Sequence, residues 1–244
     1  ISKNTIVIFM TDNGPQQTRY NAGMRGLKSS VYRGGVRVPF FVRFPSSFKG
    51  NRDISETCVN TDIFPTIAGL CGSTLPADRI IDGKSMVPLL RGENIVWEDR
   101  ALLFTWTRKY PELYNNIALQ RGKYKLAGHV DHDAELTEVE LFDIENDPFE
   151  QKNLVKENLS LAGELKEEMD KIFFELVASP NLTVPQRIII GSSSENTLFL
   201  NRNDAAGDRG IWAQDEIFGF WRVDILEGMY NIRFRFLNPL KKGG

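Results

Sequence analysis

Short apolar runs alternate with polar, glycine-rich loops in the first part of the chain. Residues Ile6–Met10 form an unbroken apolar run that ends in a turn-rich segment starting at Asp12. A run without alternation is typical of a strand covered on both faces, as in an α/β sheet. A second extended segment is predicted over Val36–Pro45, but Pro39 makes it a poor central strand because proline cannot donate a ladder hydrogen bond.

Two later segments have the periodicity of amphipathic helices. The first begins at Asp62, which can cap it, carries Pro65 in its first turn and ends at Gly72. The second covers Leu159–Val177, where an apolar stripe is flanked by lysines and glutamates. Both are predicted to bury one face.

Between these helices the pattern favours short strands that form a small antiparallel sheet. Arg121-Gly122 suits a tight turn between the second and third of them. The predicted strands are Ala101–Thr107, Ile117–Gln120, Lys123–Leu126 and Glu140–Phe142.

From Thr183 onward the pattern is that of strands alone. Trp221–Ile225 and Tyr230–Phe236 alternate apolar with polar residues on either side of Glu227-Gly228, which predicts a half-buried hairpin. This region holds about 60 residues, whereas an immunoglobulin-type sandwich needs about 100. We therefore expect two parts, residues 1–180 and an incomplete, sandwich-like β module over 181–244.

Composition narrows the class of protein. Thirty Lys and Arg against 32 Asp and Glu argue against the concentrated basic surface of a general nucleic-acid binder. No apolar run approaches the roughly 20 residues that span a bilayer. Cys58 and Cys71 are too few for a disulfide-dense scaffold. The first residues lack an initiator Met and do not resemble a signal peptide, so we expect a segment of a longer protein.

Asp12 and Asn13 are the first candidate site residues. They follow the apolar strand directly, which is where ligand-binding groups gather in open α/β sheets. A carboxylate beside an amide carbonyl offers two hard oxygen ligands for Ca²⁺ or Mg²⁺. The alternative is an ordinary turn, because Asn-Gly is a strong turn signal.

Lys28 is the second candidate. It lies on a glycine-rich loop that continues through Arg33 to Arg37, and its ammonium group could hold the oxygen of an anionic ester. The alternative is a solvated basic loop. No aromatic residues interleave with these cations as a nucleic-acid stacking platform would require.

His129 and His132 are the only histidines of the chain. The pair could chelate a transition metal, or His129 could contact a substrate from a loop. The glutamates that follow favour a solvated acidic surface instead.

Several segments, taken in order, resemble those of type I sulfatases, the formylglycine-dependent arylsulfatases. Any one of these segments alone would be weak evidence for the family. They are Thr5–Gly14, Gly26–Phe40, Asp62–Leu70, Ile81–Met86 and Leu141–Leu154. Thr183–Leu240 is similar, less specifically, to a β module appended to some bacterial sulfatases, whose aromatic residues could form a sugar-binding face or a plain sandwich core.

The resemblance implies an α/β fold of the alkaline-phosphatase-like superfamily, with the antiparallel sheet starting near residue 100. It implies that Asp12 and Asn13 are half of the protein ligands of a Ca²⁺ ion, with Mg²⁺ an alternative. Lys28 is implied to contact the sulfate catalytically, and Arg37 to be a partner behind it. The family commonly has Glu where this chain has Arg33, which could alter loop pairing or substrate preference.

The nucleophile of the family, a formylglycine made within a Cys/Ser-x-Pro-x-Arg motif, has no counterpart here. Neither Cys58 nor Cys71 lies in such a motif. The chain therefore resembles the C-terminal part of a sulfatase, and we expect the N-terminal half to be needed for activity. The resemblance to this family also implies a periplasmic or secreted location.

The function implied is hydrolysis of a sulfate ester on a carbohydrate or an aryl alcohol. A phosphodiester or phosphonate hydrolase of the same superfamily is one alternative. A non-catalytic fragment that binds glycans through its β region is the other.

Overall fold

The structure is a computed structural model that describes residues 2–107, 110–129, 134–184, 186–195, 197–201, 205–206 and 219–235. The chain divides into two compact units, Ile1–Ala178 and Ser179–Gly244, and each is described by itself. Among the described residues, no helix combines the length and apolar character needed to cross a membrane.

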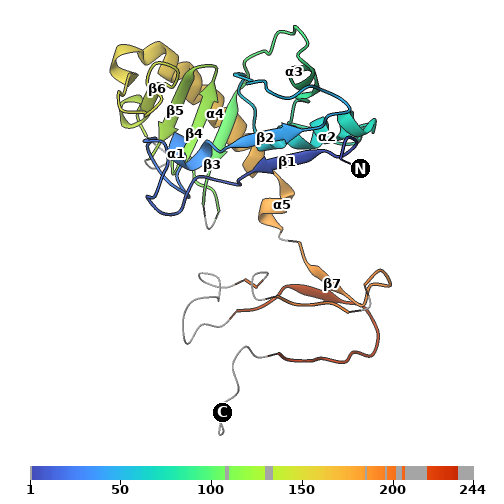
Figure 1. Ribbon diagram of the computed structural model, residues 1–244. Helices are drawn as coiled ribbons and strands as arrows, with labels where there is room; N and C mark the ends of the chain where they lie inside the picture. Colours follow the sequence, from blue (N-terminus) through green and yellow to red (C-terminus); the bar gives the residue numbers. More distant parts are fainter. Residues whose placement is uncertain are drawn as a thin grey trace. The chain divides into compact units, whose positions relative to one another are not determined.

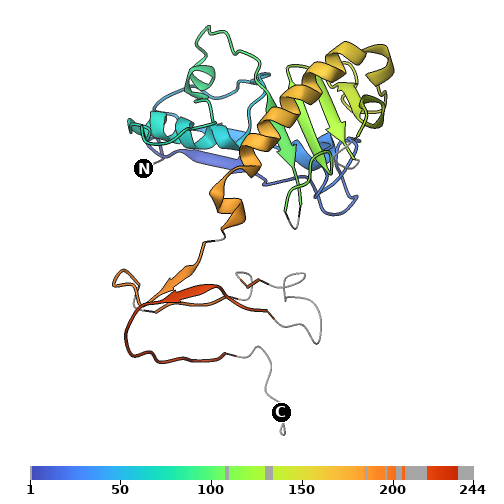
Figure 2. The same ribbon diagram turned by 180° about the vertical axis from the view of Figure 1, so that it is seen from behind.

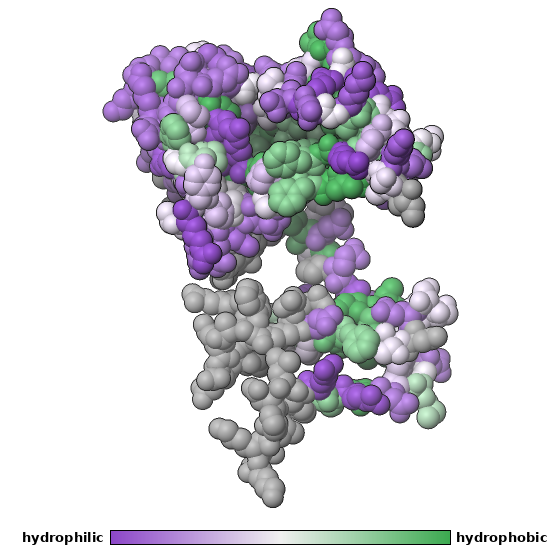
Figure 3. Space-filling model, viewed as in Figure 1, coloured by the Kyte–Doolittle hydropathy of each residue, from purple (hydrophilic) through white to green (hydrophobic). Residues whose placement is uncertain are grey.

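The first unit opens with a two-stranded antiparallel sheet. Strand β1 (Val7–Met10) pairs with β2 (Phe40–Arg43), and the short helix α1 (Arg33–Val36) precedes β2 (Figure 1). The expectation that β1 is covered on both faces is wrong for the described residues. Phe9 and Phe41 are 60% and 65% exposed, and hydrophobic side chains gather over these two strands in Figure 3. An unbroken apolar run reports two apolar faces, but not whether other elements cover them.

Helix α2 (Ile63–Cys71) forms where the periodicity predicts it and ends at Gly72, whose φ of 71° only glycine adopts easily. A short helix α3 (Val87–Arg91) follows.

Asp62 does not cap α2 with its side chain, which corrects the predicted role. Its buried carboxylate accepts hydrogen bonds from the backbone amides of Val59 and Lys84 and pairs with Arg100. Asp62 thus joins three separate segments, because a fully buried carboxylate needs several donors to offset its lost hydration.

The four-stranded antiparallel sheet is confirmed. Its strands are β3 (Leu102–Thr105), β4 (Ile117–Arg121), β5 (Tyr124–Gly128) and β6 (Glu140–Asp143), in that spatial order. Gly122, at a φ of 57°, makes the tight turn between β4 and β5.

Helix α4 (Leu159–Val177) is also confirmed, and it lies across one face of this sheet (Figure 2). Its stripe residues Leu165, Met169 and Phe173 are buried in the main core against Ile117, Leu119 and other strand residues. Short 3₁₀ turns at Leu136–Glu138 and Val155–Glu157 complete this part.

The second unit contains helix α5 (Pro180–Thr183) and two strands, β7 (Ile188–Ile190) and β8 (Val223–Ile225). The predicted hairpin is wrong over the described residues, because β8 pairs with β7 in parallel and residues 230–235 form no strand. Neither Glu227 nor Gly228 has the positive φ that a tight hairpin turn requires. Phe236 and Arg202–Asp204 lie outside the described residues.

Candidate active site

The loop after β1 packs against α1 and the loop before it, backbone to backbone. The amide of Gly14 donates to the carbonyl of Gly35 at 2.8 Å, and the amide of Lys28 donates to the carbonyl of Pro15 at 3.0 Å. A Cβ atom on Gly14 would lie 1.8 Å from the carbonyl oxygen of Gly34. Only glycine permits this approach, and it brings the segments of Asp12-Asn13 and Lys28 together.

The candidate side chains at this crossing are not engaged elsewhere. Asp12, Lys28 and Arg37 are exposed and Asn13 is half-buried. Within the part of the chain that the structure describes, none of the four side chains makes a hydrogen bond or ion pair. They are therefore available to a ligand.

Asp12 and Asn13 fit a hard cation in type but not in number. They supply two oxygen-bearing side chains, whereas Ca²⁺ takes six to eight oxygen ligands. Over the described ranges, no group of three or more His, Cys, Asp or Glu side chains is placed to hold a metal ion. These two residues can therefore form one side of a metal site.

His129 lies just after β5 and contacts the element that follows the Lys28 loop. Its ring packs on Tyr32 with ring centroids 5.0 Å apart, and its Nε2 contacts the Tyr32 hydroxyl and lies 3.2 Å from Glu140 Oε2. His132 lies outside the described residues, so the chelating pair stays a prediction.

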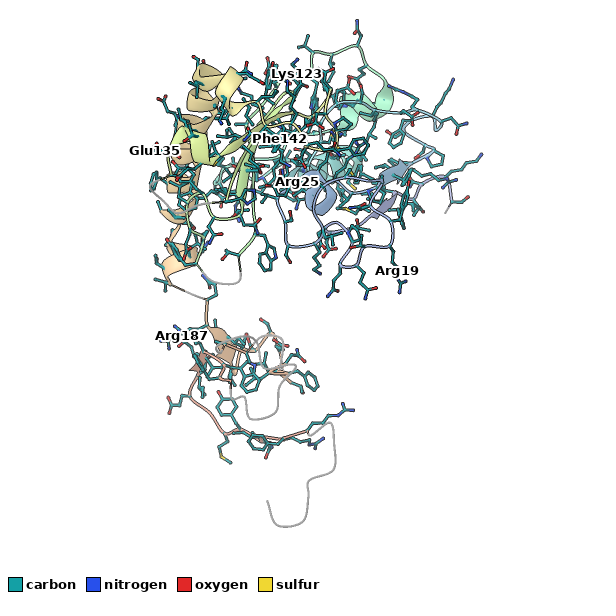
Figure 4. The ribbon with its side chains drawn as sticks, turned by 90° about the vertical axis from the view of Figure 1, so that its left-hand side faces the viewer. Arg19, Arg25, Lys123, Glu135, Phe142 and Arg187 are labelled. Carbon is teal, nitrogen blue, oxygen red and sulfur yellow. The ribbon has the colours of Figure 1, made fainter. Side chains whose placement is uncertain are left out.

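Arg25 completes this cluster. Its guanidinium lies 3.8 Å above the Tyr32 ring and pairs with Glu140 Oε1 at 3.0 Å. Figure 4 shows Arg25 beside Phe142 of β6. The sequence did not identify Arg25, Tyr32 or Glu140, because a contact across more than 100 residues leaves no local pattern.

Two members of the cluster, Tyr32 and Glu140, have shifted pKa values. Burial opposes ionisation of Glu140, but hydrogen bonds from His129, Tyr32 and Arg25 outweigh it and lower the pKa to about 2. Burial and the hydrogen bond to Glu140 raise the pKa of Tyr32 far above its ordinary value. Tyr32 therefore stays protonated and donates to an ionised Glu140.

A buried ion pair fastens α1 to the sheet. Glu150, 0% exposed, accepts from Lys125 Nζ at 2.6 Å and from the backbone amide of Arg33 at 2.6 Å. Burial lowers the pKa of Lys125, and Glu150 opposes that shift. The Arg33 side chain donates to the carbonyl of Ile144, just after β6, at 2.5 Å. Arg33, which stands where the resemblance leads one to expect Glu, is therefore fixed at the end of β6.

The family described as "N-sulphoglucosamine sulphohydrolase, C-terminal" matches residues 27–175. The chain belongs to the sulfatase family. The rat (Rattus norvegicus) steryl-sulfatase is 30% identical in an alignment of 206 positions that covers 70% of this chain and 35% of that protein. A sulfatase of Formosa agariphila is 33% identical over 171 residues, covering 66% and 30% of the two chains.

Solved sulfatase structures share the fold. The crystal structure of Ps i-CgsB in complex with k-i-k-neocarrahexaose is similar at a TM-score of 0.58 and 28% identity, over 69% of this chain and 36% of that one. The predicted fold, the C-terminal part of the alkaline-phosphatase-like sulfatase fold, is thereby confirmed. This sulfatase chain spans about a third or less of the length of the curated relatives named above.

Proposed function

We propose that this chain forms one side of the active site of a sulfuric ester hydrolase that acts on a sulfated carbohydrate or an aryl sulfate. The observation that carries the proposal is the glycine crossing, which brings the segments of Asp12-Asn13 and Lys28 together with their side chains unengaged. The name of one relative, a steryl-sulfatase, supports the hydrolysis of a sulfate ester, and the structure that holds neocarrahexaose supports a carbohydrate substrate.

Asp12 and Asn13 would hold a Ca²⁺ ion, or Mg²⁺, with other ligands from the rest of the protein. Bound there, the cation would withdraw electron density from the sulfate oxygens. Lys28 would contact an oxygen of the sulfate and offset the negative charge that develops on it. Arg37 would support Lys28, and His129, held by Tyr32 and Glu140, would contact the alcohol part of the substrate.

The nucleophile would come from the N-terminal half of the complete protein. The 244 residues contain no Cys/Ser-x-Pro-x-Arg motif that could be converted to formylglycine. Residues 1–180 would then be the C-terminal part of the sulfatase domain, and 181–244 a partial β module. Resemblance alone supports a periplasmic or secreted location.

The test uses the complete enzyme that contains this chain. We expect turnover of an aryl sulfate well above that of the matching aryl phosphate, lost on treatment with EDTA and restored by Ca²⁺. The Lys28→Ala variant should lower kcat by about 10²- to 10³-fold, as loss of one charge-stabilising group does. Lys49→Ala, which removes an exposed lysine nearby in sequence, is the control and should leave turnover unchanged.

A preference for the aryl phosphate would replace the proposal with a phosphoester hydrolase. Binding of a sulfated glycan without any turnover would replace it with a glycan-binding role.

A further inference from the structure

Asn116 lies at the point where the four-stranded sheet meets the Lys28 loop. It directly precedes β4 and has a φ of 49°, in the left-handed region that asparagine tolerates better than most residues. Its side chain reaches out of its own hairpin, toward residues more than 80 positions earlier in the sequence.

Both ends of the Asn116 amide are used on that loop. Its Nδ2 donates to the carbonyl of Ser29 at 2.9 Å, and its Oδ1 accepts from the backbone amide of Val31 at 3.2 Å. Nδ2 also donates to the carbonyl of Trp106, on the strand side, at 3.1 Å. One side chain therefore ties the loop to the sheet on either side of Ser30.

The loop it holds is bent where Lys28 projects. Ser29, next to Lys28, has a φ of 71°, a conformation that is unfavourable for serine unless surrounding contacts enforce it. The amide of Lys28 itself is bonded to Pro15 in the loop after β1. The Lys28 backbone is thus fixed from one side by the Asp12-Asn13 segment and from the other by Asn116.

Asparagine meets the requirements of this position in a way that close substitutes do not. Aspartate has the same shape but cannot donate to Ser29, and glycine fits the left-handed backbone but reaches neither partner. Glycine would leave both loop groups without their hydrogen bonds where the backbone is partly buried, and aspartate would leave the Ser29 carbonyl without its donor.

We propose that Asn116 is a positioning residue that fixes the Lys28 loop against the sheet and so sets where the Lys28 ammonium group meets the sulfate. The proposal rests on the role proposed above for Lys28. The antiparallel sheet would then contribute to catalysis, because a residue next to its strand β4 positions Lys28 on a separate loop.

The experiment uses the complete enzyme with Asn116→Gly, which removes the amide without adding backbone strain, and Asn116→Asp, which keeps the shape. Asn115→Gly is the matched control, because the exposed Asn115 bonds only to the nearby Glu112 among the described residues. Hydrogen exchange at the Val31 amide measures directly whether the loop is still held by residue 116. Kinetics on an aryl sulfate measure the effect of a loosened loop on catalysis.

We expect both Asn116 variants to lower kcat/KM on the order of a hundredfold, the effect of a small displacement of a reacting group. Asn116→Gly should also speed exchange at Val31, whereas Asn116→Asp keeps an acceptor for that amide and, on the loop, loses only the bond to Ser29. Asn115→Gly should change neither kcat/KM nor this exchange. Combined with Lys28→Ala, the Asn116→Gly change should cost nothing further, since a positioning residue acts only through the group that it positions.

Three results would overturn the proposal. They are unchanged kinetics in both variants, unchanged exchange at Val31 in Asn116→Gly, or losses that multiply with that of Lys28→Ala. If Asn116→Gly does not fold, Asn116→Asp decides. If the unmodified enzyme does not cleave the aryl sulfate, the proposed function fails, and the catalytic role of Asn116 fails with it. If the unmodified enzyme is active and the variants keep that activity, only the role of Asn116 is rejected.

Discussion

At the scale of single residues, the Lys125–Glu150 pair is the most demanding feature of the first unit. Both side chains are buried, at 1% and 0% exposure, and Nζ lies 2.6 Å from Oε1. A buried ion pair offsets its own desolvation only when both partners are present. Because Glu150 also holds the amide of Arg33, the pair links the sheet to the helix that follows the Lys28 loop.

Lys125→Met should therefore lower the free energy of unfolding by about 3–5 kcal/mol, the cost of leaving one buried charge without its partner. Urea denaturation followed by circular dichroism measures it. Lys123→Met is the matched control, since Lys123 lies two residues away and its partly exposed side chain pairs with Asp143 of β6. A loss in Lys125→Met no larger than in this control would show that the buried pair does not hold the fold.

At the scale of elements, the position of β1 relative to α1 depends on glycines. Gly14 has the carbonyl of Gly34 in the place where a side chain would stand. A methyl group there must push β1 and its Asp12-Asn13 end away from the loop that carries Lys28.

Gly14→Ala should cost at least about 1–3 kcal/mol of unfolding free energy, the usual range for overpacking. In the complete enzyme it should also lower activity on an aryl sulfate. Gly50→Ala is the control, because a Cβ at Gly50 meets no atom within 4 Å. Equal stability and activity in the two variants would mean that the crossing is loose enough to accept a side chain.

Local patterns were sufficient for elements that local sequence determines. Helix α4 was predicted over Leu159–Val177 because its apolar stripe repeats for five turns, and Gly122 and Gly72 mark turns through their backbone freedom. The hairpin expected after Trp221 failed, because alternation shows a strand with two unlike faces and not which strand it pairs with.

The candidate site likewise contains residues that the sequence identified and residues that it did not. Asp12, Asn13 and Lys28 became candidates from their local positions, and a family resemblance carried by short segments supplied the roles predicted for them. Asn116, Tyr32 and Glu140 were not identified, because their contacts join residues 85 to 108 positions apart and their own surroundings are ordinary. Long-range hydrogen bonds leave no periodicity in a single sequence.

At the scale of the whole molecule, the proposed site takes only two metal-ligand side chains, Asp12 and Asn13, and one lysine from this chain, whereas the proposed reaction needs a nucleophile and more metal ligands. We therefore expect the purified 244-residue chain to show no turnover of an aryl sulfate in the presence of Ca²⁺. Lys28 can offset charge on a sulfate but cannot attack it, because a protonated ammonium group has no free electron pair.

The measurement is the release of the aryl alcohol by the sequence-verified chain, with its Lys28→Ala variant prepared in parallel. Activity present in both samples would come from a contaminating sulfatase, since the variant lacks the charge that is proposed to contact the sulfate. Activity present in the unmodified chain and lost in Lys28→Ala would contradict the prediction. It would mean that a group within these residues supplies the nucleophile, and the division of catalytic labour proposed for the complete protein would have to be abandoned.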